Sequence, residues 1–175
     1  MRVKISFLRD QMSANTIPLH HQTLIAESLY QQIESFGGDR NLFNFSSLKG
    51  TSKIQNGFMR FLSSKVTLVL SARDGQQLEQ LVSKIFEMPY LAVGKMNLMP
   101  RSHEMIADPE FNTKMRYLCI SPMILVDPAK DPEKSQITID PTSQEFSDIL
   151  YEQTLDRMER AGFSESDLNN FAEFD

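Results

Sequence analysis

The residues of this sequence that could carry out chemistry lie between positions 20 and 53. Two adjacent histidines, His20 and His21, could transfer protons, because the pKa of histidine lies near working pH. A tyrosine and an arginine follow, and then two lysines that could hold a phosphate. The six candidates are His20, His21, Tyr30, Arg40, Lys49 and Lys53.

Each of the first four candidates also has a structural interpretation. Adjacent residues on a helix point about 100° apart, so only one of the two histidines can face a site. His21 stands four residues before Ile25 and could simply flank the core. Tyr30 could be a core tyrosine with a hydrogen-bonded hydroxyl, and Arg40 a solvated loop arginine.

Hydrophobic periodicity predicts the elements that must position these side chains. Arg2–Phe7 alternates as a strand does, and the apolar stripe of Ile25, Leu29 and Ile33 predicts a helix from Pro18 to Phe36. Asp74 reads as the N-cap of a second helix that ends near Pro89. The remaining strands are expected at Leu42–Leu48, Phe58–Leu62, Lys65–Ser71, Tyr90–Met99 and His103–Ile106, with Met115–Ile120 closing the set and Asn56-Gly57 as a hairpin turn.

This order predicts an α+β fold, a ferredoxin-like, RNA-recognition-motif-like βαββαβ sandwich over residues 1–122. Residues 123–175 hold two short strands and a helix at Ser143–Ala161, followed by a capped turn at Ser164. These elements cannot bury a full face by themselves. We therefore expect the first half of a second ferredoxin-like domain, incomplete in this sequence.

Composition restricts the classes of protein that the chain can belong to. With 41% hydrophobic and 23% charged residues in 175, a packed core is feasible without metals or disulfides. The single cysteine Cys119, the lack of a signal peptide and the lack of a spanning apolar run predict a cytoplasmic protein without a membrane partner. The net charge is −5, but residues 1–125 hold 14 lysines and arginines against 10 carboxylates, whereas residues 126–175 hold 4 against 13. A nucleic-acid surface is therefore expected in the first part.

Several short motifs occur together in the order of one known family. They are the opening strand, Pro18-Leu19-His20-His21-Gln22 leading to Tyr30, Arg40-Asn41-Leu42-Phe43-Asn44-Phe45-Ser46, and the strand that ends in Ser121-Pro122. In this respect the chain resembles the CRISPR-associated repeat-cleaving endoribonucleases, the sixth CRISPR-associated family. Two departures stand out: the family's closing glycine-rich loop is absent, and Gly37–Arg40 contains no histidine where many members carry a general base.

The resemblance implies a function in antiviral defence, namely metal-independent cleavage of repeat-containing precursor RNA. A 2′-hydroxyl attacks the adjacent phosphate, which requires a base, an acid and a cation. By resemblance His20, His21 and Tyr30 are the catalytic candidates, and Arg40, Lys49 and Lys53 are the candidates for phosphate binding. We expect the His20/His21 end of the first helix and the Arg40 turn to hold a single phosphodiester. No metal or other cofactor is expected; the partners are CRISPR repeat RNA, other CRISPR-associated proteins and a second copy of the chain.

Two alternatives to this nuclease hypothesis stay open. The first is a family member that binds RNA or acts as a scaffold without cleaving, in keeping with the two departures. The second is a ferredoxin-like protein-interaction domain. Asn56–Phe61 has a faint likeness to the aromatic strand of RNA-recognition folds, but plain sheet packing is the expectation for it.

Overall fold

The computed structural model describes residues 1–107 and 139–173. The chain forms two compact units, Met1–Pro109 and Glu110–Asp175, which are described separately. The predicted boundary after residue 122 and the predicted strand Met115–Ile120 lie outside the described residues. The division at residue 122 therefore stays a prediction.

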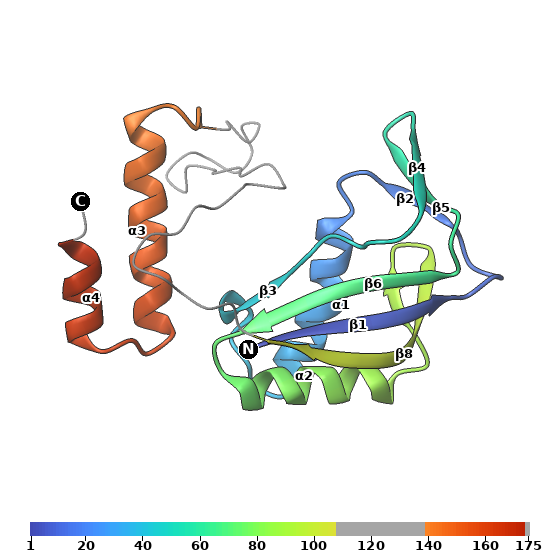
Figure 1. The fold of residues 1–175 in the computed structure, drawn as a ribbon, viewed down its shortest axis with the longest axis horizontal. Helices are drawn as coiled ribbons and strands as arrows, with labels where there is room; N and C mark the ends of the chain where they lie inside the picture. The colour runs from blue at the N-terminus through green and yellow to red at the C-terminus, as the bar shows by residue number, and fades with distance from the viewer. Residues whose placement is uncertain (108–138, 174–175) are drawn as a thin grey trace. The chain divides into compact units, whose positions relative to one another are not determined.

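The first unit is built on a five-stranded antiparallel sheet with the strand order β3-β6-β1-β8-β7 (Figure 1). The first strand of the chain lies in the middle, between β6 and β8. This is the strand arrangement of a ferredoxin-like sandwich, so the predicted fold class is confirmed. The strands are β1 (Arg2–Arg9), β3 (Phe43–Phe45), β6 (Lys65–Ala72), β7 (Leu91–Val93) and β8 (Met96–Ile106).

Two helices, α1 (Gln22–Ser35) and α2 (Gly75–Glu87), cover one face of this sheet (Figure 1). Alternate strand residues supply the other half of the core, since side chains on a strand point to opposite faces in turn. The predicted helical stripe of Ile25, Leu29 and Ile33 is fully buried. Asp74 caps α2 as predicted, and its carboxylate accepts hydrogen bonds from the amides of Gln76 and Gln77.

The structure corrects three of the predicted boundaries. The first helix begins at Gln22, because Pro18 is the last residue of β2 (Thr16–Pro18), a strand in a segment expected to be loop. The predicted extended segments around residues 90–106 form the hairpin of β7 and β8. β8 lies beside β1, whereas the predicted strand Met115–Ile120 falls outside the described residues. Pro100 is tolerated in β8 because it sits at a register shift in the ladder.

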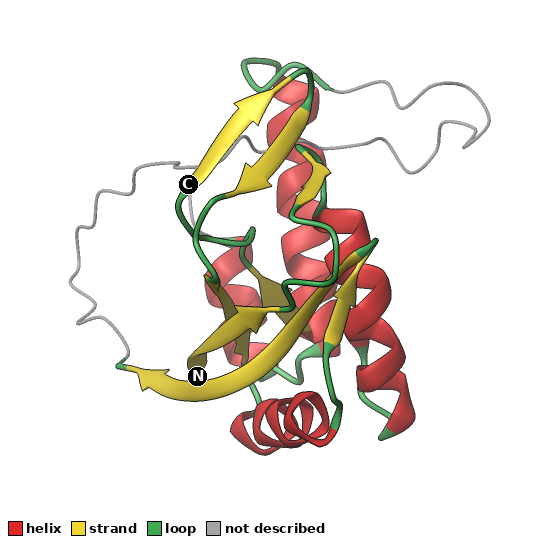
Figure 2. Cartoon of the chain, turned by 90° about the vertical axis from the view of Figure 1, so that its right-hand side faces the viewer, coloured by secondary structure: helices red, strands yellow, loops and turns green. Residues whose placement is uncertain are grey.

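A second, three-stranded sheet has the order β2-β5-β4 and projects from the first unit, with β4 at Ser52–Gln55 and β5 at Phe58–Phe61 (Figures 1 and 2). The predicted Asn56-Gly57 turn joins β4 to β5. Asn56 has φ 51° and Gly57 has φ 75°, the left-handed conformations that such a two-residue turn requires. The inner face of this sheet joins the core through Ile17 and Phe61, both buried.

The described part of the second unit contains α3 (Gln144–Arg160) and α4 (Glu165–Ala172). The helix predicted at Ser143–Ala161 is thus confirmed, with Ser143 as its N-cap. Ser164 and Asp167 form a reciprocal capping box at the start of α4, as their types and spacing predicted. Among the residues with described placement, no helix is long and apolar enough to cross a membrane.

Candidate functional site

The start of α1 is organised by a buried histidine. His21 is the N-cap residue of α1 and only 1% exposed. Its Nδ1 lies 3.2 Å from the carbonyl oxygen of Pro18 and 3.0 Å from that of Leu19, while its Nε2 accepts the amide hydrogen of Leu48 at 3.3 Å. Because Nε2 must accept, the proton of the neutral ring is on Nδ1. Both nitrogens are therefore occupied by the protein itself.

The charge state of His21 agrees with this structural role. Burial lowers the pKa of His21 below its usual value of 6.5, and hydrogen bonds to the carbonyls of Leu19 and Pro18 oppose the shift in part. Protonation would also remove the acceptor for the Leu48 amide. This geometry fits the structural interpretation of His21 and leaves His20 as the histidine that is accessible here.

Exposed groups that could bind an anion surround this end of α1. His20 is exposed, and Lys49 is exposed directly after Leu48, whose amide is bound to His21. A second link joins the same segments, because the side-chain amide of Gln22 donates to the hydroxyl of Ser47 at 3.3 Å. The first turn of α1 contains no acidic residue, and its N-terminal amides lack a side-chain cap. A helix N-terminus of this kind attracts phosphate.

Tyr30 and Arg40 form a separate pair. The guanidinium carbon of Arg40 lies 5.5 Å from the centre of the Tyr30 ring, and the same ring packs edge to face on Phe45 at 6.4 Å. Arg40 is placed by a short 3-10 helix, Arg40–Leu42, which Asp39 caps by accepting from the Asn41 amide. Tyr30 is half-buried against the core, as expected for a structural tyrosine, while Arg40 is exposed.

The cations are thus distributed differently from the expectation. Tyr30 lies about 12 Å further along the axis of α1 than Gln22, at 1.5 Å per residue. Arg40 accompanies Tyr30, whereas Lys49 accompanies the two histidines. The Arg40 turn therefore does not lie at the His20/His21 end of α1, where the two had been expected to hold one phosphodiester.

The projecting sheet adds residues that the sequence analysis had set aside. Phe58 on β5 is 50% exposed, although plain packing was expected for its strand, whereas Phe61 is buried. Arg60 is exposed, and it lies directly opposite Lys53 of β4 in the strand register. The signal that could have identified them is the alternation itself, since Phe58 and Arg60 are two residues apart and must share a face.

In the strands that the structure describes, the open face of the main sheet lacks the stacking aromatic residues of an RNA-recognition motif. Its central positions are occupied by small, aliphatic or charged side chains such as Lys4, Ser6, Thr67 and Val69, in place of aromatic rings that could stack on bases. The charge of Lys4 is also paired with Glu104. Within residues 1–107 and 139–173, no cluster of side chains could hold a metal ion.

Comparison with known proteins supports the fold. No protein-family model matches the chain, and no curated protein matches it significantly. Three solved structures that share its ferredoxin-like fold are described as a Cas6 protein, a Cas6-related protein and a RAMP protein. The resemblance drawn from the sequence motifs is therefore confirmed at the level of the fold.

The particular matches are distant in sequence. A structure described as CRISPR-associated protein Cas6 is 22% identical with a TM-score of 0.65, over 83% of this chain and 64% of that one. A RAMP protein described as binding different RNA substrates is 16% identical with a TM-score of 0.76, over 91% of this chain and 71% of that one. A Cas6-related protein from Pyrococcus furiosus is 18% identical with a TM-score of 0.68, over 92% and 70%. The chain thus spans about two thirds of the length of these proteins.

Proposed function

We propose that this chain binds CRISPR repeat RNA and that the N-terminal end of α1 is where a phosphate of that RNA lies. The observation that carries the proposal is that exposed His20 and exposed Lys49 adjoin His21 and Leu48, whose hydrogen bond lies at the start of α1, where the first amides lack a side-chain cap. A positive site of this kind suits a phosphate, and one of the fold relatives is described as binding RNA. Arg40, beside Tyr30 further along α1, and Lys53 on β4 are candidates for further phosphate contacts away from this site.

Cleavage of the bound RNA is a second candidate function, for which the exposed position of His20 is the specific support. In such a reaction the 2′-oxygen attacks phosphorus, the 2′-hydroxyl proton passes to the Nε2 or Nδ1 of His20, and the bond to the 5′-oxygen breaks. The departing 5′-oxygen takes up a proton from water, so the products are a 2′,3′-cyclic phosphate and a 5′-hydroxyl. Lys49 would stabilise the charge that develops on the phosphate.

A non-cleaving RNA-binding protein is the alternative to this second function. Within the described residues, His21 is fully engaged in structural hydrogen bonds, and Gly37–Arg40 supplies no histidine. If the chain did cleave RNA, His20 would have to act as the base without a second histidine nearby to serve as the acid. If His20 only contacts phosphate, its replacement weakens binding and leaves no chemical step to lose.

The test is a titration of the full chain with labelled repeat RNA in EDTA, at several salt concentrations. Phosphate binding predicts that log K falls linearly with log salt, by about 0.7 for each contact to a single strand. His20→Ala and Lys49→Gln should both weaken binding, and Lys84→Gln on α2 is the matched control, since Lys84 is paired with Glu87 on α2. Binding that is independent of salt, or equal losses in the control, would contradict the proposal.

Cleavage is read from the same samples by electrophoresis. A product with a cyclic phosphate that appears in EDTA and disappears with His20→Ala supports the endoribonuclease. Tight, salt-dependent binding without any product supports the RNA-binding alternative. The absence of binding to repeat RNA would favour a protein-interaction domain instead.

A further inference from the structure

The outer face of the β2-β5-β4 sheet carries an unusual set of side chains. Directly opposite residues share a face, so the register places Arg60 between Thr16 and Lys53, and Phe58 between Pro18 and Gln55. Two cations and an aromatic ring are therefore neighbours on one exposed surface. We refer to Lys53, Phe58 and Arg60 as the hairpin patch.

The two cations of the hairpin patch repel each other in the free protein. Like charges directly opposite on neighbouring strands destabilise a sheet. Throughout the described ranges, neither Lys53 nor Arg60 forms an ion pair with a carboxylate, whereas Lys4, Lys84 and Arg160 do. A bound anion would remove this repulsion. The arrangement is thus unfavourable for the fold alone and favourable for a ligand with negative charge.

The aromatic ring shows what kind of anion fits. Phe58 is 50% exposed beside these cations, and a π-face next to positive charge suits a base that stacks while its phosphates are neutralised. Bases can stack on protein only where they are unpaired. Single-stranded nucleic acid meets both requirements, whereas a duplex offers phosphates alone.

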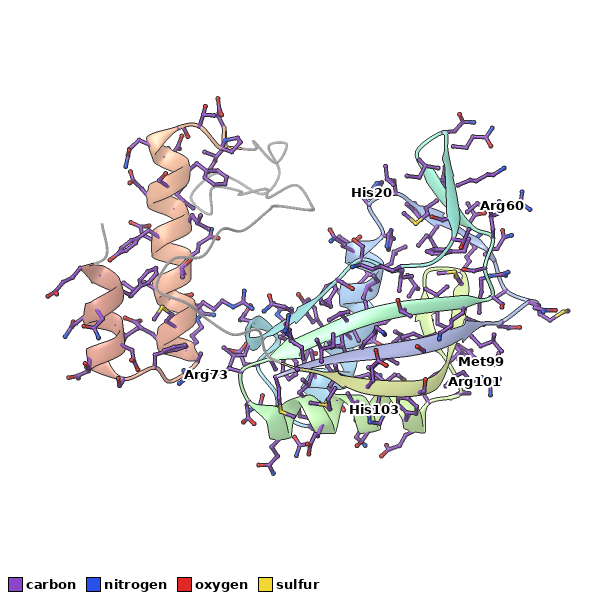
Figure 3. All side chains as sticks on the ribbon, in the orientation of Figure 1. His20, Arg60, Arg73, Met99, Arg101 and His103 are labelled. Atoms are coloured by element: carbon purple, nitrogen blue, oxygen red, sulfur yellow. The ribbon has the colours of Figure 1, made fainter. Side chains whose placement is uncertain are left out.

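The hairpin patch also continues into the site at the start of α1. β2 runs from Thr16, opposite Arg60, to Pro18, opposite Phe58, and the amide of Leu19 then donates to the carbonyl of Gly57 at 2.8 Å. The next residue is His20. Figure 3 shows Arg60 on the projecting sheet and His20 at the start of α1, whereas Arg101 and His103 lie on β8. A single RNA strand that crosses the hairpin patch would therefore also reach His20.

We infer that the hairpin patch binds an unpaired segment of RNA next to the α1 site, with phosphates on Lys53 and Arg60 and a base on Phe58. This inference rests on the proposed function, because it extends the same RNA along the surface. It assigns to Phe58 and Arg60 a role in binding single strands, whereas plain sheet packing had been expected for Asn56–Phe61.

The experiment measures binding of the full chain to a fluorescent single-stranded RNA of about 12 nucleotides, within the usual range of site sizes. Lys53→Gln/Arg60→Gln should make the salt dependence less steep by about 1.4, at 0.7 for each lost contact. Phe58→Ser should weaken binding about fivefold or more, and with little change in the salt slope. The control is Lys84→Gln/Arg101→Gln. It also removes one lysine and one arginine, but from α2 and β8 and not from the hairpin.

The outcomes separate the two proposals. If the wild type binds and both hairpin variants match it, the patch is not the binding surface and the α1 proposal stands. If the double control loses as much as the hairpin variants, the losses are not specific to the patch and the inference is wrong, and the single variant Lys84→Gln then decides the α1 proposal. If only duplex repeat RNA binds, the inference about single strands is wrong while the proposed function survives. If the wild type binds neither RNA, both are wrong. Circular dichroism checks that each variant is folded, and ultraviolet cross-linking of the RNA to the Phe58 peptide gives an independent measurement.

Discussion

Replacing His21 by alanine should lower the free energy of unfolding by about 3 kcal/mol. The change removes the acceptor of the buried Leu48 amide, which costs about 1–3 kcal/mol when left unsatisfied, and it removes the contacts of Nδ1 with the carbonyls of Pro18 and Leu19. The space of a ring that is 1% exposed adds a cavity. His20→Ala, at the exposed neighbour, is the matched control and should stay within about 0.5 kcal/mol of wild type.

The assay is urea unfolding of the three proteins, together with hydrogen exchange at the Leu48 amide. In the His21 variant this amide should exchange faster, because it has lost its partner. A cost below about 1 kcal/mol, or an unchanged exchange rate at Leu48, would show that the hydrogen bonds of His21 do not support the fold as argued.

The difference in unfolding free energy between wild type and His21→Ala should also depend on pH, in a direction set by the lowered pKa of His21. Because the pKa of His21 is lowered in the folded state, the unfolded chain takes up a proton first as the pH falls below 6.5. The stability due to His21 is complete above that pH and falls as the pH approaches the folded-state pKa, by at most about 1.4 kcal/mol per pH unit. The gap between wild type and His21→Ala should therefore narrow in mild acid. A gap that widened would mean that the folded protein favours the charged ring.

Substitutions at Asp74, Gly57, Arg40 and Tyr30 test the local structure, each by urea unfolding. Asp74→Ala should cost about 1 kcal/mol through loss of the α2 cap, and Asp74→Asn should retain most of the cap. Gly57→Ala should cost about 1–2 kcal/mol from backbone strain alone, since φ is +75° and nothing lies within 4 Å of an added Cβ. Gly57→Asn should recover part of that cost, and an equal loss would contradict the turn geometry. Arg40→Ala should cost about 0.5–1 kcal/mol through its contact with Tyr30, whereas Tyr30→Phe keeps the ring and should leave stability unchanged. A fall in RNA cleavage with Tyr30→Phe would then assign a role to the hydroxyl.

The parts of the fold that follow from local chemistry were predictable from the sequence. The alternation of β6, the cap at Asp74 and the Asn56-Gly57 turn are each specified by residues adjacent in the chain. β2 was missed because three residues show no periodicity, and the strand exists only through its pairing with β5. The sequence did not predict which extended segment pairs with β1, because several could have filled that place and only the ladder with β8 decides it.

The candidate site was predictable only in its residue types. The role of His21 depends on Leu48, which is 27 positions away, so nothing near the histidine could distinguish a buried cap from a base. The pairing of Arg40 with Tyr30 likewise depends on how the segment after α1 folds back. Phe58 was expected to pack because no second aromatic motif stands on a neighbouring strand, but the face that it occupies is decided by the register with β2 and β4.

We therefore expect the two adjacent histidines to have different roles: His21 positions the site, and His20 is the one available to contact RNA. His21 fixes the Pro18–Leu19 turn on one side and the Leu48 segment on the other, so the residues that follow from these anchors, His20 and Lys49, are held on a rigid frame. Binding groups need such support, because an exposed side chain on an unanchored loop is positioned too loosely to select one phosphate. Loss of His21 should thus weaken RNA binding in buffer without denaturant, at a pH where the variant remains folded, although the His21 ring is buried and only 1% exposed. If His21→Ala bound repeat RNA as tightly as wild type, the frame would be irrelevant to the site, and His20 and Lys49 would have to be positioned by the RNA.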